Sequence, residues 1–268
     1  MKQAVIKIRH MWRVYLMVFK LSIMSRFTYP MSTLFSIGSV FIDMFIYVVF
    51  ANVIFSYVPH VAGFSHDQLF LIVGTSMLLE WLSWFTFRSG TSTAPDWIRN
   101  GKIEASFVKP LPSHFLALFT RMDIEDLTRA VTALLLIIPH RAAIATPVLL
   151  HVGYYIVSIL CSLIIYFALL SSVSSLAFFL GKLDGLWAIV SDLNDMARYP
   201  YTIFSKKIQW IFFSIIPTAF LGSIPTLILT TQNPLNWLAF SFVIAAVSLY
   251  LSNRMWRWAE SHYSGASG

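Results

Sequence analysis

The sequence is dominated by apolar runs that are long enough to cross a lipid bilayer. A transmembrane helix needs about 20 mainly apolar residues, because the hydrocarbon core is about 30 Å thick. Of the 268 residues, 57% are hydrophobic and only 12% are charged, whereas soluble domains carry about 25% charged residues. We therefore expect an all-α polytopic membrane protein, one transmembrane domain over residues 1–268. Its six expected spans are residues 31–57, 68–90, 114–139, 147–180, 208–230 and 235–253.

The distribution of lysine and arginine predicts which side of the membrane each loop faces. Cytoplasmic loops carry an excess of these residues. With both termini in the cytoplasm, the three outer loops hold one basic residue, Arg141, out of 19. The others lie on the inner side, which includes a second cytoplasmic segment at residues 181–207, or in the inner half of the third span. The pattern therefore predicts cytoplasmic N- and C-termini.

Residues 1–27 are expected to form an amphipathic helix that lies in the cytoplasmic interface of the membrane. Its basic residues fall on one face at 100° per residue, and Met11, Tyr15 and Val18 lie opposite. Trp12 suits the level of the lipid headgroups. An ordinary solvated helix is the alternative. The basic residues that share the face are Lys2, Arg9, Arg13 and Lys20.

Residues 96–112, which we call the hook, form the longest internal break in the hydrophobicity. The hook lies within the loop at residues 91–113, between two long apolar runs. Asp96 can cap a short helix, Gly101 permits that helix to stop, and the prolines that follow force an extended exit. Such a charged and bounded segment is one that a soluble partner can hold. The alternative is a loop whose basic residues only set the topology.

Two acidic residues, Asp43 and Glu80, lie inside expected spans. A carboxylate at the centre of a bilayer costs about 2.5–3.5 kcal/mol on insertion scales, so such groups face a cavity or a partner. One interpretation is a polar lining of a translocation pathway or a proton relay. The other is a structural pair with a nearby base such as Arg129, or a polar contact across a subunit interface.

The third and fifth spans depart from simple apolar helices. In the third, i,i+4 spacings predict ion pairs among charged residues, a structural network with substrate contact as the alternative. In the fifth, Pro217, Gly222 and Pro225 predict a helix that ends near Pro217, followed by a re-entrant hairpin packed in protein. The charged residues of the third span are Arg121, Asp123, Glu125, Asp126 and Arg129.

No catalytic or metal-binding motif accompanies these features. Gly101-Lys102 and Gly181-Lys182 lack the Ser or Thr and the upstream glycine that a phosphate-binding loop requires. The seven histidines are scattered, and the single cysteine, Cys161, lies in an apolar run. We expect no metal site and no enzymatic activity in this chain. Any energy for transport must then come from an ion gradient or from another subunit.

Three segments together resemble the ABC-2 type transporter permeases, in the six-span subgroup of about this length. The first is Arg88 with Trp97, Gly101, Ile103 and the Lys109-Pro110-Leu111 tripeptide. The second and third are Ala197-Arg198-Tyr199-Pro200 with Ile203-Phe204, and Ile216-Pro217-Thr218-Ala219-Phe220 with Ile224-Pro225. They occur in order and the resemblance covers essentially the whole chain.

The resemblance implies one half of an exporter in a bacterial inner membrane. Two permease subunits, identical or a sister pair, would dimerise and bind two copies of a separate ATPase. ATP and Mg²⁺ would be held by that ATPase, and this chain would hold no cofactor. The first helix would be an interfacial connector, and Pro217, Gly222 and Pro225 would form an outer gate. The hook would be the coupling helix, with Asp96, Trp97, Ile98, Arg99, Gly101, Lys102 and Lys109 as its ATPase-coupling residues.

Two other functions are compatible with a polytopic membrane protein. A gradient-driven secondary transporter would use Asp43 and Glu80, but many such folds contain inverted repeats, and the two halves of this sequence show none. A non-transport scaffold or channel subunit is the second. Co-purification of a stoichiometric ATPase subunit would support the exporter and neither of these.

Overall fold

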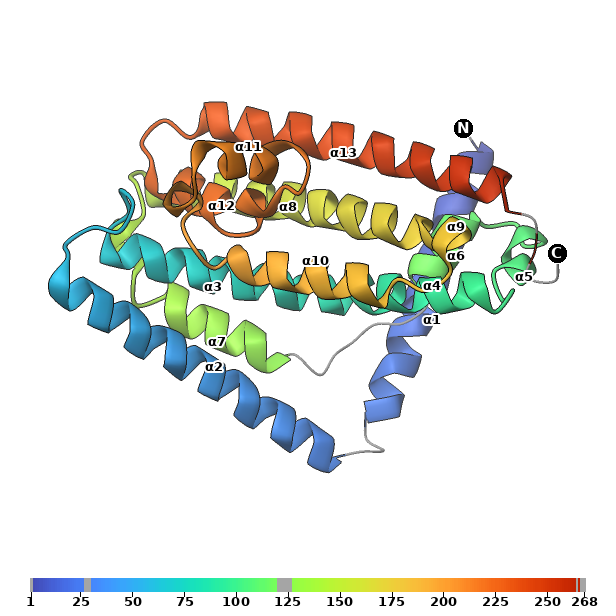
Figure 1. Ribbon diagram of the computed structural model, residues 1–268, viewed down its shortest axis with the longest axis horizontal. Helices are drawn as coiled ribbons and strands as arrows, with labels where there is room; N and C mark the ends of the chain where they lie inside the picture. Colours follow the sequence, from blue (N-terminus) through green and yellow to red (C-terminus); the bar gives the residue numbers. More distant parts are fainter. Residues whose placement is uncertain (1, 27–29, 120–126, 264, 266–268) are drawn as a thin grey trace.

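Long helices that run side by side set the long axis of the molecule (Figure 1). The computed structural model describes residues 2–26, 30–119, 127–263 and 265, and these residues form helices and loops with no strand. The chain is thus the all-α protein that the sequence predicts. Four helical stretches of the described chain are long and apolar enough to cross a membrane: Gly38–Tyr57, His66–Arg99, Val148–Leu180 and Leu235–Ser261.

The two ends of this bundle are formed by different connections. At one end lie the hook, with the short helix α5 (Glu104–Phe107), and the C-terminus (Figure 1). At the other end lie the loop at residues 58–65 and the connection at residues 138–147 between α7 (Leu127–Ile137) and α8 (Val148–Ser175). We call them the hook end and the far end.

The second apolar run forms one continuous helical stretch that is longer than expected. Ser65 caps α3 (His66–Ser83), and the side chain of Gln68 bonds back to the Ser65 backbone in a capping box. A π-helical turn, η1 (Trp84–Arg88), then leads into α4 (Ser89–Arg99). The helix therefore does not end at Gly90, as the 68–90 boundary predicts, but runs directly into the hook.

The third expected span, residues 114–139, is not one helix. The helix α6 (Ser113–Leu118) ends before Phe119 at the hook end, and α7 is described from Leu127. Thr128–Ile137 is too short to cross a membrane by itself, and it packs against α3 and α2. Arg121, Asp123, Glu125 and Asp126 lie outside the described residues, and so does the pairing expected among them.

Two antiparallel helices, α8 and α13 (Leu235–Ser261), form the other side of the bundle (Figure 1). Buried serines along α8 allow neighbouring backbones to approach closely. Ser162 donates a hydrogen bond to the Phe220 carbonyl at 2.6 Å, and Ser174 donates one to the Thr91 carbonyl at 2.9 Å. α9 (Ala177–Leu180) extends α8 toward the hook end.

Residues 181–207, which the sequence predicts to form one cytoplasmic segment, extend from one end of the bundle to the other. Leu183, just before α10 (Asp184–Met196), lies in a buried cluster at the hook end with Ile98. Beyond α10, the hydroxyl of Thr202 in η3 (Tyr201–Ile203) donates to the carbonyl of Ala62 at the far end, at 2.7 Å. This segment runs the length of the bundle because the apolar face of α10 packs on α8 and η1. A hydropathy average along the sequence combines that apolar face with the acidic residues on the other side of the helix, so the average does not reveal the face.

The residues of the fifth expected span, 208–230, form a re-entrant pair of short helices. α11 (Lys206–Ser214) leads inward from the far end, η4 (Thr218–Leu221) makes the bend, and α12 (Ser223–Thr230) returns. The bend is buried between α8 and α13, which is where irregular backbone at membrane depth is tolerated. The predicted break in this span is therefore present, but α11 and α12 together replace a span.

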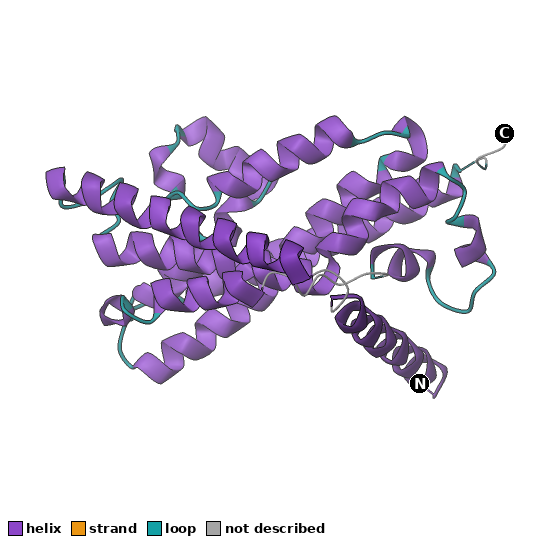
Figure 2. Ribbon diagram, turned by 90° about the horizontal axis from the view of Figure 1, so that it is seen from below, coloured by secondary structure: helices purple, strands orange, loops and turns teal. Residues whose placement is uncertain are grey.

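The first helix, α1 (Lys2–Arg26), lies at a steep angle to the long helices (Figure 2). It touches the bundle through aromatic contacts. The rings of Tyr15 and Phe119 are 6.1 Å apart, and those of Phe19 and Phe85 are 5.7 Å apart. The arrangement leaves Trp12 exposed. α2 (Pro30–Tyr57) then runs along the bundle to the far end.

Candidate functional site

A buried carboxylate, Glu80, lies at the centre of the bundle. It is in the last turn of α3, and its side chain is 9% exposed. A lone carboxylate at this position would be strongly unfavourable, because burial removes its hydration. The surrounding helices therefore have to supply cations.

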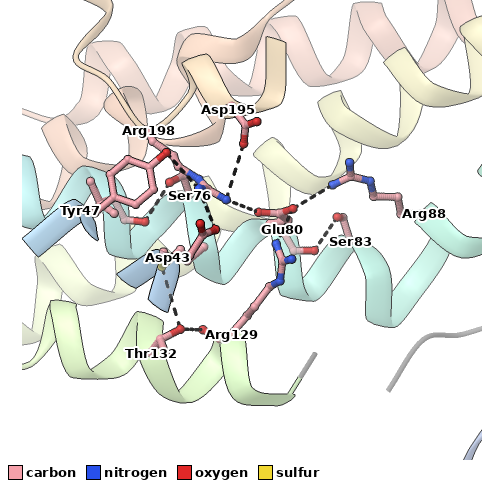
Figure 3. Close-up of polar contacts among 12 residues, drawn as sticks. Asp43, Tyr47, Ser76, Glu80, Ser83, Arg88, Arg129, Thr132, Asp195 and Arg198 are labelled. Atoms are coloured by element: carbon pink, nitrogen blue, oxygen red, sulfur yellow. Dashed lines mark hydrogen bonds and ion pairs between the residues drawn. The ribbon is translucent and has the colours of Figure 1, made fainter. Parts of the chain in front are cut away.

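Three arginines from three different elements meet Glu80 (Figure 3). Arg129 of α7 places Nη1 2.6 Å from Glu80 Oε1, and Arg88 at the end of η1 places Nη1 3.4 Å from the same oxygen. Arg198, two residues after α10, donates from Nη2 to Glu80 Oε2 at 3.1 Å. The π-helical turn and the crossing of α10 bring arginines from both sides onto one carboxylate.

Two further carboxylates and a phenol complete this cluster (Figure 3). Arg198 lies 3.6 Å from Asp43 Oδ2 of α2 and 3.7 Å from Asp195 Oδ1 of α10. Its Nη1 donates to the hydroxyl of Tyr47 at 3.1 Å, and its guanidinium stacks 5.0 Å from the centre of the Tyr47 ring. Asp43 and Asp195 are 55% and 59% exposed. We call the six charged residues Asp43, Glu80, Arg88, Arg129, Asp195 and Arg198 the ion cluster.

The ion cluster is balanced, with three carboxylates against three guanidinium groups among the described residues. Burying an ion is costly unless its partners satisfy it, and each arginine here has a carboxylate within 3.4 Å. Arg88 also lies 4.7 Å from the centre of the Trp84 ring, a favourable cation–π contact. The cluster therefore joins α2, α3, α7 and α10. Its charged groups can change partners within the cluster, but removing one of them leaves a charge without its partner.

The structure brings together residues that the sequence placed apart. Glu80 does meet Arg129, the base suggested for a structural pair, and Asp43 meets the same cluster through Arg198. The sequence missed Arg88 and Arg198 as partners, because it placed Arg88 at the end of the second span and Arg198 in a cytoplasmic segment. The i,i+3 spacing of Asp195 and Arg198 was a detectable signal of a local ion pair.

The hook is attached to the hook end of the bundle by two buried isoleucines. Ile98 and Ile103 are fully buried in a cluster with Leu118 and Trp256. Gly101 lies between them with φ of 67°, a left-handed conformation that glycine adopts without steric cost and that ends α4. The hook is thus a firm continuation of the helix that carries Glu80.

Three details of the hook differ from the sequence interpretation. Asp96 does not cap a new helix, because α4 has already begun at Ser89. Ile98 is not available to a partner, because it is part of the chain's own core. Arg99 is already paired, with Nη2 2.8 Å from Asp96 Oδ1. The large hydrophobic side chains that the hook exposes are Phe107 and Val108, and Val108 is 87% exposed.

The expected gate residues lie together in the re-entrant segment. Pro217 precedes η4, Gly222 follows it, and Pro225 lies in the first turn of α12, and all three are buried. A Cβ atom at Gly222 would collide with the carbonyl oxygen of Ala197. Only a glycine permits this approach, which holds the bend against the residue that precedes Arg198.

The arrangement is suited to transmitting a displacement. The exposed hook, the continuous helix 66–99, the ion cluster and the re-entrant bend are in contact in that order. Each link is a packed or ion-paired contact, and packed interiors transmit strain because they have few voids. A displacement of the hook can therefore be transmitted through these contacts to the re-entrant bend.

Comparison with protein families gives one match that covers most of the chain. The family described as ABC-2 family transporter protein matches residues 41–267. Neither the comparison with curated proteins nor that with solved structures finds a similar protein. The match includes the hook, the ion cluster and the re-entrant segment. The chain is a multi-pass membrane protein that belongs to the ABC-2 transporter family, a permease component of an ABC transporter.

Proposed function

We propose that this chain is the permease subunit of an ATP-driven exporter. Two permeases, identical or paralogous, would form the translocation pathway between them in a bacterial inner membrane. Two copies of a separate ATPase would bind and hydrolyse ATP with Mg²⁺, and this chain would hold no nucleotide itself. Membership of the ABC-2 family supports this division of labour, because such a permease associates with an ABC ATPase.

The observation that carries the proposal is the hook at the end of a membrane-length helix. The helical stretch His66–Arg99 is long enough to span and passes without a break into the hook. The hook presents exposed Phe107 and Val108 between Lys102 and Lys109. An apolar tip flanked by lysines fits an apolar groove with an acidic rim on the ATPase.

The hook can carry force because it is anchored in the core. Ile98 and Ile103, on either side of the turn at Gly101, are both buried in the cluster at the hook end. An ATPase that moves the exposed tip would therefore move α4 with it, and α4 continues through Arg88 into Glu80. In this proposal the ATPase contacts Lys102, Phe107, Val108 and Lys109. Ile98 transmits the resulting displacement to the core.

The ion cluster then links the moving helix to the translocation pathway. Arg88 and Glu80 lie on the helix that ends in the hook, whereas Arg198 follows α10 and leads to the re-entrant segment. A shift of the first against the second would exchange ion-pair partners without exposing a bare charge. The bend at Pro217, Gly222 and Pro225 would be the outer gate, and this shift would move it.

The orientation of the permease in the membrane follows from the assignment of the hook as the element that binds the ATPase. The hook end would face the cytoplasm, where the ATPase is, and would hold both termini. The far end, with Ala62 and Thr202, would face outward. Lys206 and Lys207 join Arg141 at the far end, so the outer side would hold three basic residues, and the inner side would still hold most of the 19.

The test compares two charge-introducing variants at exposed valines on opposite ends of the bundle. The permease would be purified with its ATPase from membranes, and stimulated ATPase activity would be measured in vesicles. Val108→Asp in the hook should greatly lower both the co-purified ATPase and the activity. Val58→Asp, which changes an exposed valine at the far end, should leave both unchanged, and both variants should insert into the membrane as the wild type does.

Two outcomes would contradict the proposal. If Val108→Asp retains full ATPase binding and stimulated activity, the hook is not the docking element. If the purified permease transports cargo in vesicles without any ATPase, a gradient-driven transporter is the correct function.

A further inference from the structure

Three metal-ligating side chains converge at the far end of the bundle, well away from the ion cluster. His66 and Asp67 begin α3, and His140 lies in the connection after α7. The Nδ1 atom of His66 is 3.5 Å from Asp67 Oδ1, and the Nε2 atom of His140 is 3.9 Å from the same oxygen. One ligand atom from each residue lies within 4.8 Å of the others.

The tautomer of the neutral His140 ring follows from the contact of its other ring nitrogen. The Nδ1 atom is 2.8 Å from the carbonyl oxygen of Leu136. A carbonyl can only accept, so Nδ1 must carry the proton. In a neutral imidazole the Nε2 atom then presents a lone pair, and this is the atom that faces Asp67. The ring is also held in place by stacking on Phe70, with ring centres 4.3 Å apart.

The same reasoning fixes His66. Its Nε2 atom is 3.3 Å from Asn52 Oδ1. The amide of Asn52 is oriented, because its Nδ2 donates to the Val48 carbonyl at 2.8 Å. His66 Nε2 therefore donates to the Asn52 oxygen, and His66 Nδ1 presents a lone pair toward Asp67.

Three acceptors thus face one another, two imidazole lone pairs and a carboxylate. Such groups repel unless a proton or a metal ion lies between them. In protein metal sites the ligating histidine typically donates its other N–H to a carbonyl or a carboxylate, which orients the ring. Both histidines here have that second contact. Asp67 lies in the first turn of α3, where the helix dipole favours a negatively charged side chain.

We propose that His66, Asp67 and His140 bind a divalent transition metal ion of the Zn²⁺ class. Imidazole and carboxylate ligands suit zinc, whereas Mg²⁺ and Ca²⁺ prefer oxygen ligands alone. Tetrahedral zinc with bonds of about 2.1 Å places neighbouring ligand atoms about 3.4 Å apart. The three side chains would have to close by on the order of 1 Å to reach this geometry.

The site would connect three elements of the far end. His66 and Asp67 belong to α3, His140 follows α7, and Asn52 of α2 holds His66 from behind. All three ligands are partly exposed, so an ion can enter from solution, and water can occupy the fourth position. A bound ion would thus fix the start of α3 relative to the α7–α8 connection.

The test uses the full chain, purified in detergent without a polyhistidine tag and stripped with a chelator. Co²⁺ serves as the spectroscopic probe, because tetrahedral Co²⁺ has visible d–d absorption, and Zn²⁺ is then added in competition. We expect one Co²⁺ per chain, displaced by Zn²⁺ but not by excess Mg²⁺ or Ca²⁺. The isosteric variant Asp67→Asn and the variant His140→Gln should each weaken Zn²⁺ binding at least tenfold and abolish the absorption.

The matched control is His60→Ala, which removes an exposed histidine from the loop at the same end. It should bind both ions as the wild type does. The proposal is overturned if Asp67→Asn and His140→Gln both keep wild-type affinity, or if His60→Ala weakens binding as they do. A wild-type chain that takes up no Co²⁺ also overturns it, whether or not the variants fold.

Discussion

Glu80 shows how one residue can be both an obstacle to folding and a necessary part of it. Its carboxylate has no place at the centre of an apolar bundle unless cations come with it. Arg88, Arg129 and Arg198 supply them from three elements. The residue therefore specifies which helices must be neighbours. It does so more strongly than apolar side chains, which can pack in many combinations.

Neutralising Glu80 should destabilise the protein severely. Glu80→Gln keeps the shape of the side chain but leaves the buried Arg88 and Arg198 and the partly buried Arg129 around an uncharged amide. Breaking a buried ion pair in this way costs roughly 3–5 kcal/mol. The measurement is the midpoint of thermal unfolding in detergent, followed by tryptophan fluorescence.

The matched control for Glu80 is Asp192→Asn, which neutralises an exposed carboxylate on α10 and should leave the midpoint nearly unchanged. A proton relay makes the opposite prediction for Glu80→Gln. It predicts that transport is abolished while thermal stability is kept, and that result would contradict a structural role for Glu80.

At the scale of elements, the contact between α10 and the re-entrant segment decides the shape of the far half of the bundle. Gly222 lies against the carbonyl of Ala197, and the hydroxyl of Ser223 accepts from the backbone N–H of Tyr201 at 3.1 Å. These contacts hold the bend beside the chain that leaves α10. The two segments are therefore expected to move together.

A methyl group at this contact should separate the two segments. Gly222→Ala places a Cβ against backbone that cannot rotate away, and overpacking of this kind costs about 1–3 kcal/mol. We expect a lower unfolding midpoint and faster proteolysis in the connection at residues 197–205. In the control Gly185→Ala, the new Cβ meets no atom within 4 Å, and a more helix-favouring residue in α10 should stabilise it by up to about 1 kcal/mol.

At the scale of the whole molecule, the structure assigns each connection to one of two ends. The hook and Leu183 lie at the hook end, whereas Ala62, Thr202 and His140 lie at the far end. This requires the segment at residues 184–204 to traverse the bundle to the far end, where α11 enters the bundle and α12 returns to the same end. The helices that reach the far end are thus not the same set that the hydropathy suggests.

Chemical labelling in intact vesicles measures this arrangement. In a Cys161→Ala background, single cysteines would replace three exposed residues, His60, Lys206 and Lys102. The variants His60→Cys and Lys206→Cys should react with a membrane-impermeant maleimide from the same side, and Lys102→Cys should react only from the opposite side. If Lys206→Cys instead reacts together with Lys102→Cys, residues 181–207 lie on one side and the assignment of α10 is incorrect.

The sequence alone determined the helical class, the membrane location and the position of the break in the fifth apolar run. These properties depend on composition and on local spacing, so they can be predicted from the sequence without knowledge of the fold. Hydrophobic runs of about 20 residues require helices in a membrane, and Pro217, Gly222 and Pro225 interrupt a helix wherever it lies. The resemblance to the ABC-2 family likewise rests on short local motifs.

Only the tertiary structure decided which charges meet and which segments cross. Arg198 is 118 residues from Glu80, and His140 is likewise far along the chain from His66, so no local pattern links them. α10 traverses the bundle although its sequence is mixed, because its apolar face packs on α8 and η1 while Asp192 and Asp195 on its other side stay exposed. Burial of a charge depends on its neighbours in space, and those neighbours are fixed only when the helices pack.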